Sequence, residues 1–444
     1  MAIDSQLIVE RRRYDPETEE RLRAGTNKPV PDGVFRSLGL GLITGASDDD
    51  PSAIGTYAAV GAWLGPAFLW AAPFMFPMMF AVVYLSSKLG QVSGRGLFAV
   101  IRRHYSAGVL YLFLATAVIG NLIEAGADLG GMAAALNIIV PAPIHLLVVL
   151  LGLVVLGLQW RDYRLIRNIF RWLALALLAY VGSAILARPE VWPAIRGTLI
   201  PSIQWNKKFF VLLVAIIGTS LSAYLYSWQS NQDVEEDISM GRRRLTDRMG
   251  TTEAELRHSR RDIALGMFFS NLVMYFIILS TAATLFKLGK SDISTAADAA
   301  RALRPVAGNA AGLLFAAGVV GVGFLAVPVM TIGAAFDICQ SFGWRHGLHV
   351  QWKRARPFCT TVSVLTVVAI ALNFLPINPM RALVFAGIAQ GVSTPFLMLM
   401  VMLITNNRKI MGRWVNTRAM NILGWFTTTV MFSATLGLLI TLVK

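Results

Sequence analysis

Three consecutive carboxylates, Asp48, Asp49 and Asp50, interrupt an apolar segment and are followed by Pro51. Apolar sequence of helical length continues on both sides of them. An ionisable residue at membrane depth costs several kcal/mol, so it normally faces a water-filled cavity or a bound ion and marks a transport path. The stretch therefore predicts a cation-handling site. The alternative is a polar loop between two helices that happens to be acidic.

The same stretch predicts a break in its helix. Pro51 lacks an amide N–H and disfavours helical geometry at Asp50, and the small residues from Gly45 onward loosen the preceding turn. A break frees backbone carbonyls before it and N–H groups after it, and such discontinuous helices form the substrate sites of secondary transporters. A second candidate break is the GTSLSAYLYSWQSNQ stretch that begins at Gly218.

The composition places these features in a membrane. The chain has 444 residues, of which 55% are hydrophobic and only 15% are charged, as in a polytopic membrane protein. Residues 1–33 are polar, without a cleavable signal, which predicts a cytosolic N-terminal tail. Two cysteines suggest no disulfide framework. The charge of +15 could suggest nucleic acid, but its placement argues against such a partner.

Eleven apolar segments approach the length of about 20 residues that spans a bilayer. They cover residues 34–66, 67–89, 107–138, 144–158, 168–187, 209–232, 263–286, 310–339, 359–375, 378–405 and 419–443. With the N-terminus inside, 30 of the 40 Lys and Arg residues lie in the inward segments, counting Arg36, Lys88 and Arg171 at the inner ends of their spans. Cytoplasmic loops carry such an excess, so the count predicts a cytosolic N-terminus, an outside C-terminus and an anionic lipid bilayer as partner.

Segments one and six, which carry the two candidate breaks, are five apart. This spacing predicts an inverted repeat of five plus five helices with both breaks at one shared midplane site. The predicted parts are the tail over 1–33, a first repeat over 34–208, a second repeat over 209–405, and an eleventh helix over 406–444.

Two further acids, Glu124 and Asp128, lie within the third segment, four residues apart and so on one helix face. Glu124 could carry protons, bind a second cation or pack between helices, and these readings stay open. None of the five histidines falls in the middle of a predicted span. The chain also shows no His, Cys or metal-ligand cluster at a helix end, so we predict that it is not an enzyme.

Over nearly its whole length the sequence resembles the Nramp family of divalent metal transporters. The resemblance rests on the helix count, the Asp50-Pro51 break, the Gly-Thr-Ser break at residues 218–222, and the ADLGGMAAALN segment that contains Asp128. It implies an all-α, LeuT-like fold with discontinuous helices one and six. It also implies a transported metal ion as substrate, with no cofactor, and an acid used in proton coupling at Asp128.

The departures from the family pattern concern the metal ligands. The family reads Asp-Pro-Gly-Asn in helix one, where this chain has Ser52 and Ala53 after Pro51. The family's Met-Pro-His of helix six is replaced by Ser222, Ala223 and Tyr224. Soft thioether ligands favour thiophilic metals, whereas carboxylates, hydroxyls and waters suit Mg²⁺, Ca²⁺ or Mn²⁺. The chain is therefore similar to the magnesium-transporting branch of the family.

The resemblance implies a metal site with Asp50 as direct ligand, backbone oxygens at Ser47 and Thr219, and the Ser222 hydroxyl or a water that it holds. Asp49 is an additional candidate ligand, although Asp48 and Asp49 could instead provide electrostatics at an entrance.

The predicted function is import of a divalent cation, Mg²⁺ or Mn²⁺, across the plasma or bacterial inner membrane. Proton coupling is expected to be weak or absent because Tyr224 stands at the histidine position, with Asp128 and Glu124 as coupling or second-site candidates. The alternatives are a symporter of a small organic substrate on the same scaffold and a non-transporting membrane sensor.

Overall fold

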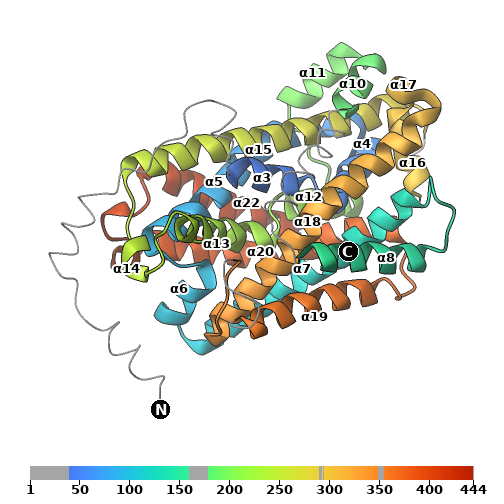
Figure 1. Ribbon diagram of the computed structural model, residues 1–444. Coiled ribbons are helices and arrows are strands. Elements are labelled where there is room, and N and C mark those ends of the chain that lie inside the picture. The colour runs from blue at the N-terminus through green and yellow to red at the C-terminus, as the bar shows by residue number, and fades with distance from the viewer. Residues whose placement is uncertain (1–39, 160–178, 290–292, 294, 349–354, 444) are drawn as a thin grey trace.

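A computed structural model describes residues 40–159, 179–289, 293, 295–348 and 355–443. Within these ranges the regular structure is entirely helical (Figure 1). The predicted tail, residues 1–33, lies outside the described residues, as does most of the fifth predicted span.

The first predicted break is confirmed. Helix α3 (Leu40–Asp48) ends just before the proline, and α4 (Pro51–Leu64) begins at it. Asp50 has extended backbone geometry, with φ −64° and ψ 171°, and its side chain accepts a hydrogen bond from the Ala53 amide at 2.7 Å. Pro51 therefore begins a new helix that Asp50 caps, as expected for a proline in the first helical position.

The second predicted break is confirmed as well. Helix α12 (Lys207–Ser220) ends before Leu221, whose φ of −128° and ψ of 43° are not helical. Helix α13 (Ala223–Ser239) starts after Ser222, which is in an extended conformation. Both breaks fall at short polar side chains, which compete with the helix for backbone hydrogen bonds.

The other helices are connected by short segments. The longer ones are α5 (Ala71–Ser93), α6 (Leu97–His104), α7 (Ala107–Leu136), α8 (Ile144–Gln159), α10 (Ala179–Leu186), α11 (Val191–Leu199), α15 (Glu253–Thr281), α18 (Ala311–Phe342), α19 (Arg356–Leu372), α20 (Pro379–Thr405) and α22 (Arg418–Val443). Single-turn helices are α14 (Leu245–Arg248), α16 (Ala296–Ala300), α17 (Arg304–Ala307) and α21 (Arg408–Met411). Among the described residues, seven helical stretches are long and apolar enough to cross a membrane, and the predicted count of eleven is not confirmed.

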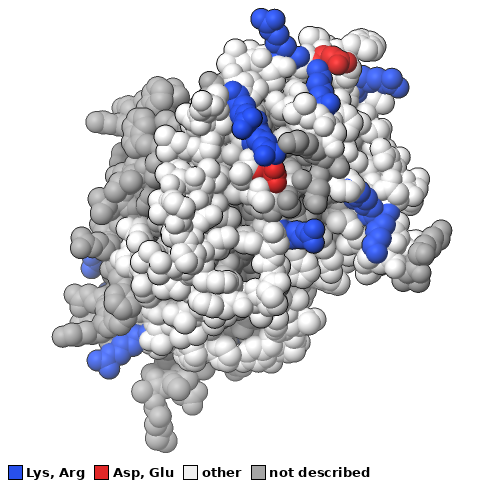
Figure 2. Space-filling view, turned by 90° about the vertical axis from the view of Figure 1, so that its right-hand side faces the viewer, with Lys and Arg blue, Asp and Glu red and all other residues white. Residues whose placement is uncertain are grey.

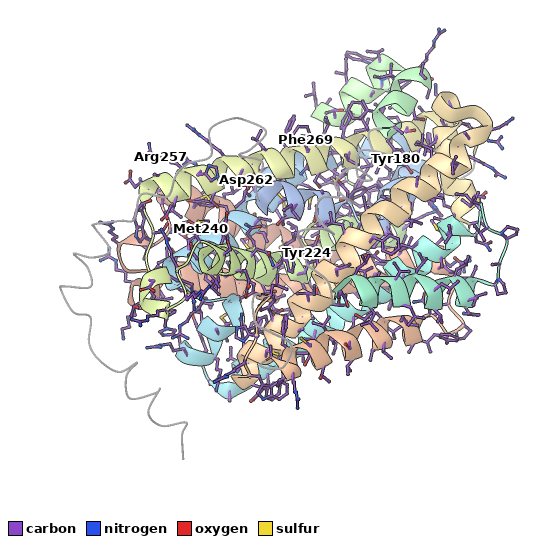
Figure 3. All side chains as sticks on the ribbon, viewed as in Figure 1. Tyr180, Tyr224, Met240, Arg257, Asp262 and Phe269 are labelled. Atoms are coloured by element: carbon purple, nitrogen blue, oxygen red, sulfur yellow. The ribbon has the colours of Figure 1, made fainter. Side chains whose placement is uncertain are left out.

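Helix α15 differs most from its predicted span, because it begins at Glu253 rather than at residue 263. Thr252 accepts a hydrogen bond from the Glu255 amide, and the Glu255 carboxylate accepts one from the Thr252 amide. This capping box starts the helix before its apolar part, so the polar turns around Arg257 are helical too (Figure 3).

Helix α15 lies along α3 (Figure 1). A Cβ atom added at Gly41 would lie 2.6 Å from the Ile263 amide nitrogen, so the two backbones touch there. The Gly41 amide also donates to the Asp262 carboxylate at 2.6 Å. Small residues allow such close approach in membrane bundles, and here they fix the half-helix that leads to Asp50.

The two ends of the bundle differ. Helices α6 and α14 lie at one end, and α11, α16 and α17 lie at the other. The second end, viewed in Figure 2, is largely uncharged, with scattered Lys and Arg side chains.

Candidate metal site at the two helix breaks

Ser52, in the first turn of α4, is surrounded by three buried carboxylates. Its hydroxyl donates to Asp50 Oδ1 at 2.7 Å and lies 3.3 Å from Glu124 Oε1. Its amide donates to Asp128 Oδ1 at 2.9 Å. Ser52 therefore contacts both acids of α7, Glu124 and Asp128. It stands at the position where the family has glycine.

Residues of the second break contact the same cluster of Ser52 and Glu124. The Ser222 hydroxyl lies 2.7 Å from Glu124 Oε1 and 3.0 Å from the carbonyl oxygen of Thr219. The Thr219 hydroxyl lies 3.0 Å from that of Ser52. Glu124 is thus the carboxylate that joins the two breaks.

Gln390 of α20 contacts both Glu124 and the start of α13. Its side-chain amide donates to Glu124 Oε2 at 2.8 Å, and its oxygen accepts from the Ala223 amide at 3.1 Å. From the sequence alone, Gln390 could be a polar cavity residue or take part in ordinary helix packing. The only signal was one amide side chain within a long apolar helix.

Among the described residues, the site gathers acidic side chains without a basic partner. Asp50, Glu124 and Asp128 are fully buried, and in the described ranges no Lys, Arg or His forms an ion pair with any of them. Asp50 Oδ2 and Asp128 Oδ2 have no hydrogen-bond partner. A buried carboxylate without a counter-charge is strongly destabilising, so this arrangement is suited to receive a cation. The atoms that could coordinate a metal ion here are all oxygens, which match hard cations.

In the described chain, neither Asp49 nor the Ser47 hydroxyl forms a hydrogen bond to this cluster, and the backbone oxygen of Ser47 stays a predicted ligand. Asp49 turns toward α15, where its Oδ1 lies 3.4 Å from the Ser270 hydroxyl. Ser47 lies on α3 and donates its hydroxyl to the Thr44 carbonyl. Asp50, Thr219 and Ser222 are brought together with Glu124 and Asp128. No three Asp, Glu, His or Cys side chains of the described chain already stand in metal-binding geometry.

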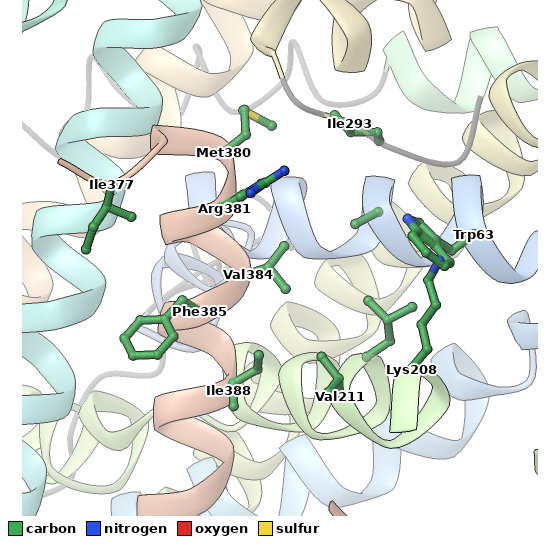
Figure 4. Close-up of a pocket in the computed structure, with 12 residues that line it drawn as sticks. Trp63, Lys208, Val211, Ile293, Ile377, Met380, Arg381, Val384, Phe385 and Ile388 are labelled. Carbon is green, nitrogen blue, oxygen red and sulfur yellow. The ribbon is translucent and has the colours of Figure 1, made fainter. Parts of the chain in front are cut away.

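A cavity of about 480 Å³ opens between α4, α12 and α20 (Figure 4). Its walls are mostly apolar, and its charged lining residues are Lys208 and Arg381. Ala59 lies about two turns beyond Ser52 on α4, and Ile388 stands two residues before Gln390 on α20. The cavity therefore approaches the site from the half of the bundle that contains α4 and α12.

In the half that contains α3 and α13, described residues link the helices. Arg242 pairs with Asp237 at the end of α13 at 3.3 Å and with Glu255 of α15 at 3.0 Å. Together with the contact between α3 and α15, this ion-pair network ties the ends of α13 and α15 together on that side.

Comparison with known proteins decides the family. Residues 41–441 match Nramp, described as natural resistance-associated macrophage protein-like. The chain belongs to the Nramp family. Nramp proteins are transporters and not enzymes, in agreement with the prediction from sequence.

Relatives and solved Nramp structures extend over most of the chain. It is 24% identical to the divalent metal cation transporter MntH of Klebsiella pneumoniae (strain 342), over 94% of this chain and 96% of that protein. It is 26% identical to MntH of Deinococcus radiodurans, over 94% of each. A crystal structure of the Eremococcus coleocola manganese transporter superposes with a TM-score of 0.70 at 20% identity, over 94% of this chain and 89% of that one.

The wider fold is also recognisable. Mhp1, a nucleobase-cation-symport-1 family transporter, superposes in a closed conformation with a TM-score of 0.59 at 15% identity, over 91% of this chain and 90% of that one. The predicted all-α, LeuT-like fold of a multi-pass membrane protein is therefore confirmed.

Proposed function

We propose that this Nramp protein imports a divalent cation, Mg²⁺ or Mn²⁺, across the plasma or bacterial inner membrane. The observation that carries the proposal is the position of Glu124, which bonds to Ser222 at one break and approaches Ser52 and Asp50 at the other. The cation would bind Asp50 and Glu124, with the Thr219 carbonyl and the Ser222 hydroxyl as neutral oxygens. The relatives' names, divalent metal cation transporter and manganese transporter, support this substrate class.

The ligand types favour a hard cation. Serine and tyrosine stand at the family's methionine and histidine positions, so the site offers neither thioether nor imidazole. Mg²⁺ releases water reluctantly and is usually held by one or two carboxylates with several waters retained. A site with few side-chain ligands suits this behaviour.

Alternating access follows from the asymmetry of the bundle. The cavity leads toward the site between α4 and α20, while α3, α13 and α15 are linked in the opposite half. With the N-terminus in the cytosol, the open half faces outside. Release then requires α3 to separate from α15 and the Arg242 pairs to break.

Two isosteric substitutions test the metal site. We expect Asp50→Asn and Glu124→Gln each to reduce Mg²⁺ and Mn²⁺ uptake into proteoliposomes to the level of protein-free vesicles, because each removes a ligand charge while preserving side-chain shape. Asp337→Asn is the control, since Asp337 is a buried acid of α18 bonded to Ser227 at 2.9 Å, outside the site. Wild-type uptake in both site variants would refute the proposal.

A further inference from the structure

Asp48 and Asp49 form a second acidic pair on the α3 side of the first break. Asp48 is wholly buried and Asp49 nearly so. The Ser270 hydroxyl of α15 lies 3.0 Å from Asp48 Oδ2 and 3.4 Å from Asp49 Oδ1, and its single proton can serve only one of them at a time. Among the described residues, Ser270 is the one whose hydroxyl lies within 3.5 Å of both carboxylates.

Unpartnered polar atoms surround this pair. Asp48 Oδ1 has no hydrogen-bond partner. Tyr224, in the first turn of α13, lies beside Asp48 and Ser47, and its wholly buried hydroxyl lies within hydrogen-bonding distance of no described residue. Native structures rarely leave buried polar atoms unpaired, so these atoms indicate a missing ligand.

The charge balance leads to the same conclusion. Five carboxylates, Asp48, Asp49, Asp50, Glu124 and Asp128, are buried around the first break, without an ion pair to a described Lys, Arg or His. One divalent cation at Asp50 and Glu124 neutralises two of these charges. Three carboxylates remain, Asp48, Asp49 and Asp128. The first two lie at the C-terminal end of α3, where the helix dipole adds further negative potential.

We propose that Asp48 and Asp49, with the hydroxyls of Ser270 and Tyr224, bind a second divalent cation. This inference rests on the proposed function, and the second site is distinct because its partners come from α15 and α13 rather than from α4, α7 and α20. Two carboxylates and two hydroxyls form an all-oxygen set suited to Mg²⁺ or Mn²⁺. Each bound cation repels the other, so occupation of the second site weakens binding at the first and favours release toward the α3 side.

The test counts bound Mn²⁺ on the purified full-length protein by electron paramagnetic resonance, in which free Mn²⁺ gives a sharp signal that is lost on binding. We expect two Mn²⁺ per chain for the wild type and one for the Asp48→Asn/Asp49→Asn double variant. The Asp337→Asn control should retain two. Ser270→Ala, a milder change outside the acids, should weaken only the second binding event.

The outcomes separate this inference from the proposed function. One Mn²⁺ per chain in both the wild type and the double variant would overturn the second site and leave the first intact. No bound Mn²⁺ or Mg²⁺ in the wild type would overturn both. Loss of both ions in a double variant that elutes as a monodisperse species would show a single shared site, which also refutes the inference.

Discussion

The two helix breaks use opposite chemistry. At the first, Asp50 caps α4 with its own side chain, which accepts the Ala53 amide, so the charge stays fixed at the helix start. At the second, Ser222 stands at the N-cap of α13 but does not cap it, because its hydroxyl is directed toward Glu124.

Gln390 takes the place of that missing cap by accepting the Ala223 amide. The first break therefore supplies a carboxylate that also caps its own helix. The second supplies neutral oxygens, and its helix start is capped by Gln390 of α20. Substitutions at the first break should abolish transport, and those at the second should tune it.

The largest effect is expected at the first break. Asp50→Ala should eliminate Mg²⁺ and Mn²⁺ uptake and also lower the free energy of unfolding by about 1 kcal/mol, because α4 loses its cap. Asp50→Asn should eliminate uptake while keeping most of the stability, since an amide oxygen still caps. Uptake in proteoliposomes and thermal unfolding in detergent separate the two effects. Equal uptake by Asp50→Ala and the wild type would show that the Asp50 carboxylate does not bind the transported cation.

A smaller loss is expected at the support of the second break. Gln390→Leu leaves both the Ala223 amide and a Glu124 oxygen without their partner, at a cost of about 1–3 kcal/mol for each unsatisfied buried group. Uptake at saturating Mn²⁺ should fall about tenfold, which corresponds to about 1.4 kcal/mol.

The matched control is Gln159→Leu, which removes bonds to Thr331 and Thr366 away from both breaks. Equal loss of uptake in the two variants would mean that Gln390 acts only through general stability.

Selectivity should change without loss of transport when the second break is given a soft donor. Ser222→Met introduces a thioether beside Glu124, so competition by Cd²⁺ against Mn²⁺ uptake should strengthen several-fold. Ser220→Met serves as the control, because the Ser220 hydroxyl lies against Tyr57 and not against Glu124. Unchanged Cd²⁺ competition in Ser222→Met would show that this position does not face the ion.

The smallest signal is expected for protons. Uptake should follow the membrane potential with little acidification of the vesicle lumen, because the second break carries Tyr224 and no histidine. A pH-sensitive dye trapped in proteoliposomes, with a valinomycin-set potential and a protein-free control, measures this directly. Metal-dependent acidification that disappears in Asp128→Asn would instead make the acids of α7 a proton route.

Local chemistry explains which features the sequence could predict. Pro51 and the short polar residues around Ser222 act on their own backbone, so both breaks were predictable to within a few residues. The capping box at Thr252 is equally local and could have placed the start of α15. Apolar length alone predicts a later start, because the first turns of α15 are polar.

The rest depends on contacts between distant segments. The role of Glu124 is open from the sequence alone because its partners Ser222 and Gln390 lie 98 and 266 residues away along the chain. The different directions taken by Asp49 and Asp50 depend on Ser270, 221 residues beyond Asp49. No periodicity within α3 or α7 encodes those pairings.

The span of the Glu124 contacts has a consequence for synthesis of the protein. Its hydroxyl donors are 72 residues earlier and 98 residues later, and its amide donor comes 266 residues later. A carboxylate at the centre of an inserted helix costs about 2.5–3.5 kcal/mol. Until the ribosome has delivered α20, α7 sits in the lipid with an acid whose native partners are incomplete. A prematurely ended chain keeps that defect permanently, which gives the cell's quality control a chemical mark that distinguishes fragments from the finished protein.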